Sequence, residues 1–157
     1  MTSDPSSLEE THHFGQSEFI AVRCNEDDRR TWLADSPVCQ QLGHLNIAHV
    51  GVLHAVHPFT IVRSSQSGTF MFACTSGCGE VLVDGRWVTV RAGEACLLPP
   101  FVANAIRAIK GEAPWSFCWV RYLESQERLP IVSSKSPVKG SFASDVLRYA
   151  VEGLHAE

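Results

Sequence analysis

The chain has 157 residues and a mass of 17.3 kDa, which suits one ordinary domain with some flanking sequence. Apolar residues make up 45% and charged residues 19%, a composition that excludes a disordered or fibrous chain. A net charge of −4 argues against a basic nucleic-acid surface in this sequence. No apolar run approaches the roughly 20 residues of a membrane-spanning helix, and the polar N-terminus is not a signal peptide.

The six cysteines are scattered along the chain and do not form the framework of a small secreted domain. Without an export signal, we expect reduced thiols and a cytoplasmic location. Cys74 and Cys78 form a loose pair, but no second pair completes a zinc site.

The N-terminal third begins with a polar segment and ends in a charged one. Residues 1–18 are rich in Ser, Glu and His, which predicts a mobile arm. Phe19–Arg23 is a candidate short strand. The charged cluster 25–30 then predicts a helical turn that leads into Thr31–Leu33.

From residue 45 the pattern favours strands. Runs of apolar and β-branched residues predict strands at 45–53, 59–63, 70–75, 80–83, 86–90, 95–98, 103–109 and 115–122. Asp84-Gly85 predicts a type I′ hairpin, because that turn needs positive φ at both central residues. Strands about 8–12 residues apart, with no long helix between them, predict an all-β barrel or sandwich over residues 19–125.

The C-terminal segment, residues 126–157, reads as a linker followed by a helix. Apolar residues fall at helical spacing over its last part, at Phe142, Val146, Leu147, Ala150, Val151 and Leu154. We expect this stripe to contact a second copy of the chain rather than the barrel. The helix has no glycine or proline stop, which indicates a fragment of a longer protein.

The histidines raise the question of a metal site. His44, His49, His54 and His57 lie close together in sequence, but no acidic residue follows them until Glu80. A metal needs converging lone pairs, and this spacing does not easily supply three of them. We therefore expect loop and strand-edge histidines, with no metal and no cofactor. No glycine-rich phosphate loop and no Gly-x-Ser-x-Gly nucleophile motif occurs either.

The strand predicted at 115–122 carries large rings on one face. Alternation puts Trp115, Phe117, Trp119 and Arg121 on that face. Such a face can line a ligand pocket in which rings stack on a flat molecule. Simple core packing explains the same pattern, so both interpretations stay open at this point.

Two segments together resemble the N-terminal effector-binding domain of AraC-family transcription regulators. They are the run from Gly77-Cys-Gly-Glu through the Asp-Gly hairpin to Leu97-Leu-Pro-Pro100, and the strand Trp115-Ser-Phe-Cys-Trp-Val-Arg-Tyr122. The resemblance spans about Leu45–Tyr122, half of the chain. It implies a cupin-like (double-stranded β-helix, or jelly-roll) barrel with a short C-terminal helical segment for dimerisation. It also implies a small-molecule effector inside the barrel and a helix-turn-helix DNA-binding domain outside this chain.

The resemblance also assigns effector-binding positions. Arg63 stands where the arabinose-responsive member has an arginine that contacts the sugar, and Phe117 and Trp119 match the pocket strand. Asn104 stands where many members have a histidine, and Ile106 where the sugar binder has a ring with a hydroxyl. These two replacements make the implied pocket less polar.

The expected function is therefore a homodimeric, non-enzymatic sensor that binds a sugar or small organic compound and controls DNA binding by another domain. Two alternatives remain open. One is a metal-dependent cupin enzyme, such as a dioxygenase or isomerase. The other is a barrel that only dimerises, with Phe70, Phe72, Phe117 and Trp119 filling its own interior.

Overall fold

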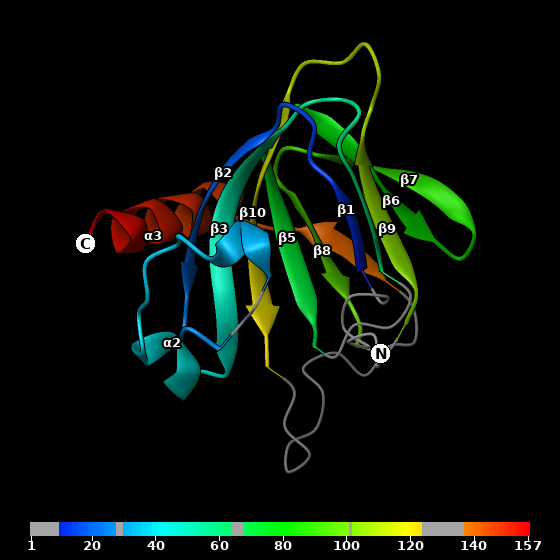
Figure 1. Cartoon of the computed structure of the whole chain (residues 1–157). Helices are drawn as coiled ribbons and strands as arrows, with labels where there is room; N and C mark the ends of the chain where they lie inside the picture. Colours follow the sequence, from blue (N-terminus) through cyan, green and yellow to red (C-terminus); the bar gives the residue numbers. More distant parts are fainter. Residues whose placement is uncertain (1–9, 28–29, 64–67, 101, 124–136) are drawn as a thin grey trace, which may run out of the picture.

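The computed structural model describes residues 10–27, 30–63, 68–100, 102–123 and 137–157. They form two facing antiparallel sheets and a C-terminal helix (Figure 1). The five-stranded sheet has the order β1 (Glu10–His13), β4 (Thr60–Arg63), β9 (Asn104–Ala108), β6 (Cys78–Val83) and β7 (Arg86–Arg91). The six-stranded sheet has the order β11 (Val138–Ser141), β8 (Glu94–Leu98), β5 (Phe70–Ser76), β10 (Trp115–Tyr122), β3 (Ile47–Ala55) and β2 (Glu18–Arg23).

The strand pairs are nested along the sequence. The outermost pair is β3 with β10, followed inward by β4 with β9, β5 with β8, and β6 with β7. Successive pairs alternate between the two sheets, so the chain rolls up into a jelly roll. The sequence-based expectation of an all-β barrel of this kind with a C-terminal helix is confirmed.

Turn chemistry sets the innermost hairpin. Asp84 has φ 50° and Gly85 has φ 79°, so both central residues of the turn between β6 and β7 are left-handed. This is the type I′ geometry that the Asp-Gly pair predicts.

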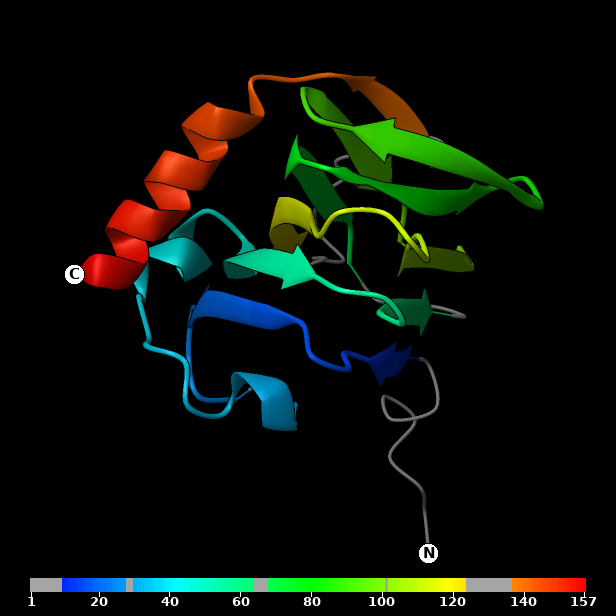
Figure 2. The same ribbon diagram turned by 90° about the horizontal axis from the view of Figure 1, so that it is seen from above.

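The helix α3 (Ser144–Ala156) covers the outer face of the six-stranded sheet, against β2, β3, β5 and β10 (Figure 2). Val151 is 3% exposed there, and Leu147 and Leu154 pack on the same apolar cluster. Three of the six residues predicted to contact a second copy thus pack on the chain's own sheet. The other three, Phe142, Val146 and Ala150, are exposed, so the stripe read from the sequence spans two different faces.

Two further segments differ from the sequence-based expectation. Part of the predicted N-terminal arm forms β1, which pairs with β4 from Glu10 opposite Arg63 to His13 opposite Thr60. Residues 1–9 lie outside the described residues, as does most of the predicted linker. The end of that linker, Val138–Ser141, forms β11 against β8.

The short helical elements lie beside β2 and β3. The 3-10 helix η1 (Thr31–Leu33) follows the charged cluster, where the sequence predicts a helical turn. The helix α2 (Gln41–His44) precedes β3 and has no counterpart among the sequence-based predictions. Leu33 and Leu42 anchor these elements as buried residues.

Glycines make room for two tryptophan rings in the interior. A Cβ atom on Gly51 would lie 2.2 Å from a ring carbon of Trp119 and 2.5 Å from the Ile20 carbonyl oxygen. A Cβ atom on Gly79 would lie 2.2 Å from ring carbons of Trp115. Gly51 therefore interrupts the apolar run of β3 because the Trp119 ring occupies the space that a side chain would need.

Gly51→Ala should lower the free energy of unfolding by about 1–3 kcal/mol, the usual cost of forcing extra volume into a packed core. Gly140→Ala is the matched control, because a Cβ atom there meets nothing within 4 Å, and it should change stability by less than about 0.5 kcal/mol. Urea denaturation measures both values. Equal stability of the two variants would contradict the close packing of Trp119 on β3.

Candidate ligand cavity

Strand β10 separates two apolar regions. Trp115, Phe117 and Trp119 belong to the core between the sheets, whereas Cys118 and Val120 belong to the cluster beneath α3. This is the face assignment that the alternation of the sequence predicts. The strand lies between β5 and β3, so both of its edges are paired, and the two apolar clusters cover its two faces.

The deeper part of the interior is filled by rings. The centroids of Trp115 and Phe117 are 4.6 Å apart, and the Phe72 centroid lies 5.4 Å from Phe117 and 5.6 Å from Trp115. The Trp115 Nε1 donates a hydrogen bond to Cys74 Sγ at 3.2 Å. These contacts leave this part of the barrel as close-packed as an ordinary core.

A cavity lies nearer the N-terminal elements. Its described lining is mainly aromatic and aliphatic and contains one charged side chain: Phe14, Phe19, Trp32, Leu53, Ile61, Arg63, Phe70, Phe117 and Trp119. The hollow measures about 300 Å³ when its part open to solvent is included, but the centre of a water-sized sphere has only about 20 Å³ in which to move. It therefore has space for about one water molecule in the observed conformation.

Three half-buried rings from the N-terminal elements close this cavity. The ring centroid of Phe14, in the turn after β1, lies 5.9 Å from the ring centroids of both Phe19 and Trp32. The ring centroid of Trp32, in η1, lies 6.0 Å from that of Trp119. The polar and charged residues around Phe14 and Trp32 gave no sign that these two rings face a cavity. The signal that could have found them is an isolated large ring, Phe14 or Trp32, within a charged or polar stretch.

A buried hydrogen bond fixes the Trp119 ring. Its Nε1 donates to Nδ1 of His49 at 2.8 Å, and both side chains are at most 3% exposed. Accepting this bond leaves the proton of a neutral imidazole on Nε2. His49 is thus a core residue of β3, whereas His54 is exposed and its Nδ1 lies 2.6 Å from Ser116 Oγ.

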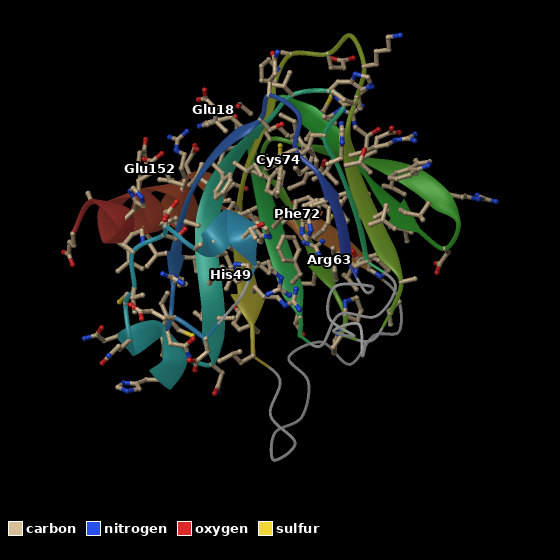
Figure 3. All side chains as sticks on the ribbon, viewed as in Figure 1. Glu18, His49, Arg63, Phe72, Cys74 and Glu152 are labelled. Carbon is tan, nitrogen blue, oxygen red and sulfur yellow. The ribbon has the colours of Figure 1, made fainter. Side chains whose placement is uncertain are left out.

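Arg63 is the charged residue of the lining. It is 3% exposed, and its guanidinium carbon lies 4.3 Å from the centroid of the Phe70 ring, which also lines the cavity. Figure 3 shows Arg63 and Phe72 in the space between the two sheets. Stacking on an aromatic face compensates part of the cost of burying the cation.

The five residues predicted to bind an effector do not all reach the cavity. Arg63, Phe117 and Trp119 line it. Asn104 is not among the lining residues; it lies opposite Arg63 in the pairing of β4 with β9 and is 2% exposed. Ile106 is fully buried between Ile61 and Val81 within the five-stranded sheet and is not among the lining residues.

Three cysteine thiols take part in packing rather than in acid–base chemistry. Burial raises the pKa of Cys74 to about 11 and the pKa values of Cys96 and Cys118 to about 12. At neutral pH these thiols are protonated, and a protonated thiol is a poor nucleophile.

Metal ligands do not converge in the part of the chain that the structure describes. Among those residues, no three His, Cys, Asp or Glu side chains gather closely enough to hold a metal ion. None of the described helices is long and apolar enough to cross a membrane.

Comparison with known proteins identifies the fold. No protein-family model and no curated protein sequence matches the chain. Among solved structures, a predicted oxalate decarboxylase from Thermotoga maritima aligns with a TM-score of 0.54 at 13% identity, over 79% of this chain and 100% of that one. The cupin domain of Schizosaccharomyces pombe Cnp3 aligns with a TM-score of 0.51 at 15% identity, over 74% and 71% of the two chains. The putative glyoxylate-induced protein of Pseudomonas aeruginosa aligns with a TM-score of 0.50 at 9% identity, over 85% of this chain and 45% of that one.

These alignments give this chain a cupin fold. At 9–15% identity, these three alignments describe the arrangement of strands and not the chemistry of the interior. The residues that line the cavity are therefore the features of this chain that bear on its function.

Proposed function

We propose that this chain is the ligand-sensing domain of a transcription regulator similar to the AraC family. It binds a small organic molecule in the aromatic cavity, leaves it chemically unchanged, and acts through α3 on a DNA-binding domain elsewhere in the regulator. The observation that carries the proposal is the position of β10. Its alternate residues contact the cavity on one side and the cluster beneath α3 on the other.

The geometry of β10 supports a direct route from ligand to helix. Phe117 and Trp119 line the cavity, and Cys118 between them lies under α3, with its Sγ 3.8 Å from the Ser144 carbonyl oxygen. A shift of the two rings on ligand binding moves the same strand that supports the helix. A ligand changes the helix position only as far as it prefers one arrangement, so we expect a coupling of about 1–3 kcal/mol.

Binding requires the closing rings to move. The present cavity holds about one water molecule, whereas pockets for small organic ligands begin near 300 Å³. Phe14 and Trp32 are only half-buried and lie on short elements at the edge of the fold. They are therefore the rings that a ligand displaces at the lowest cost.

One competing function has an observation in its favour. The contacts among Phe72, Trp115 and Phe117 fill the deeper interior, as expected of a barrel that only dimerises. The two functions differ in whether any small molecule enters the remaining hollow.

Calorimetry with a panel of sugars and small organic acids tests the sensor function. We expect at least one compound to bind at one site per chain and to lose about tenfold or more in affinity in Trp119→Ala and Arg63→Ala. Trp87→Ala and Arg107→Ala are matched controls and should leave binding unchanged. The guanidinium carbon of Arg107 lies 3.7 Å from the centroid of the Trp87 ring, and neither residue lines the cavity. The bound compound should be recovered intact.

Two results would overturn the proposal. Binding that none of the cavity variants weakens would place the ligand elsewhere. Conversion of the compound by the purified protein would favour an enzyme.

The proposed homodimer uses the outward part of α3. Val146 and Tyr149 are 69% and 64% exposed on the side of the helix opposite the buried Val151, and Phe142, which precedes the helix, is 42% exposed. This exposed apolar surface supports contact with a second copy, which the resemblance to the regulator family also implies.

The double variant Val146→Glu/Tyr149→Glu should reduce the mass measured by light scattering from that of a dimer to that of a monomer, because it puts charge on this surface. Val62→Glu is the control, since Val62 is 46% exposed on the other sheet. A dimer that survives the double variant would contradict this interface.

A further inference from the structure

Two cysteines follow a pair of hydrogen-bonded chain segments at β2, the edge strand of the six-stranded sheet. Arg23, the last residue of β2, forms an isolated parallel bridge with Val38. The Arg23 amide donates a hydrogen bond to the Pro37 carbonyl oxygen at 3.0 Å, and the Cys39 amide donates to the Arg23 carbonyl oxygen at 2.8 Å. Cys24 and Cys39 each come one residue after the bridge, so they are neighbours across the two segments.

The two side chains lie on the same side of these segments. Cys24 belongs to the apolar cluster beneath α3, and Cys39 packs against that cluster. Both also lie at α2. A Cβ atom on Gly43 would be 3.9 Å from the Cys24 Cβ, and the Cys39 Sγ donates to Gln41 Oε1 at 3.3 Å.

The bridge brings the two cysteines within reach of a disulfide. Neighbouring strands run about 4.8 Å apart, and disulfides join residues whose Cα atoms are about 4.4–6.8 Å apart. The structure shows no disulfide between Cys24 and Cys39, so forming one is an oxidation that the observed backbone accommodates.

Cys39 is the accessible member of the pair. It is half-buried and lines an open groove beside the C-terminal end of α3, whereas Cys24 is 7% exposed. An oxidant dissolved in water therefore meets Cys39 first. Three other thiols are buried, and burial raises their pKa values far above neutral pH, so they react slowly: Cys74, Cys96 and Cys118.

The chain between the two cysteines carries η1 and therefore Trp32, one of the rings that close the cavity. Within the described residues, the Arg23 side chain also holds this segment, since it donates to the carbonyl oxygens of Ser36 and Ala34 at 2.9 Å each. A covalent bond between Cys24 and Cys39 would close the segment into a ring, and ring closure removes conformations that an open segment can adopt.

We propose that Cys24 and Cys39 form a reversible redox site, which a small disulfide such as oxidised glutathione converts into a protein disulfide. The Cys39 thiolate attacks one sulfur of the small disulfide and releases half of it. The Cys24 thiolate then attacks the Cys39 sulfur and releases the other half. Two protein thiols are oxidised and give their protons to the two released thiolates, so one small disulfide is reduced to two thiols.

The disulfide restrains the segment that carries Trp32 and thereby opposes displacement of this ring. This consequence for binding rests on the proposed sensor function, in which the ligand displaces Trp32. The oxidised chain then binds its ligand about fivefold or more weakly than the reduced chain, within the usual range of coupling between two sites. Formation of the disulfide itself does not depend on any ligand.

Peptide mapping of the full chain after incubation with oxidised glutathione tests the redox site. Remaining thiols are alkylated, and the chain is digested with trypsin without reduction. Trypsin releases residues 24–29 or 24–30 and residues 31–63, and each of these peptides contains one cysteine. We expect a mass that corresponds to the two peptides joined with the loss of two hydrogens, and we expect dithiothreitol to separate them.

Two variants accompany the wild type. Cys39→Ser should abolish the linked peptide. Cys78→Ser is the matched control, because Cys78 is also half-buried but lies at the start of β6, outside the cluster beneath α3. It should leave the yield of the linked peptide unchanged.

Amide hydrogen exchange measures the restraint without any ligand. The Leu33 amide donates to the Arg30 carbonyl oxygen at 3.0 Å within the segment. Oxidation should slow its exchange about fivefold in the wild type and in Cys78→Ser, because local opening of a closed ring is less favourable. The rate in Cys39→Ser should not respond to oxidised glutathione.

The outcomes separate the redox site from the sensor function. If Cys39 and Cys24 are recovered only as separate alkylated or glutathione-bound peptides, the redox site is overturned. If the linked peptide forms but Leu33 exchanges at the same rate, the restraint of the Trp32 segment is wrong. If the disulfide forms and slows exchange while no compound of the calorimetric panel binds, the redox site stands and the sensor function is overturned.

Discussion

The two apolar clusters of this molecule meet at β10, a strand with no solvent-exposed face over most of its length. From Trp115 to Arg121 each residue is buried, and the apolar ones belong either to the core between the sheets or to the cluster beneath α3. Covering both faces of one central strand holds two apolar clusters at a fixed distance from each other. The strand therefore has a structural role, joining sheet and helix, and the proposed function uses the same geometry to carry a change in the cavity to the outer surface.

The aromatic rings of the interior serve both stability and the proposed binding. Close contacts among Phe72, Trp115 and Phe117 form a rigid base, and a single hydrogen bond from Trp119 to His49 orients the ring above it. Phe14 and Trp32 close the hollow from elements at the edge of the fold. In the proposed function, a ligand displaces these two edge rings and leaves the central packing in place, because the edge of the fold is its least stable part.

The sequence predicted the strands well because turn residues and alternation report local structure. The Asp84-Gly85 hairpin and the two faces of β10 both follow from local rules. What the sequence did not predict depends on pairing between distant segments. Strand β1 is polar and is stabilised by β4 and by the contacts of Phe14, and the apolar stripe of α3 gave no information on which surface covers it. The position of Ile106 outside the cavity lining could not be predicted for the same reason, because it depends on the register of β4 with β9.

The four tryptophans provide the most direct test of a ligand in the cavity. In a ¹⁵N-edited spectrum during titration with a compound that binds in the calorimetric panel, the account predicts that the indole signals of Trp32 and Trp119 shift with a common dissociation constant. The signal of Trp87, which stacks on Arg107 outside the lining, should stay in place, and that of Trp115, bonded to Cys74 below the cavity, should move little. Shifts confined to Trp87, or no shift at any indole while the compound binds, would contradict the account.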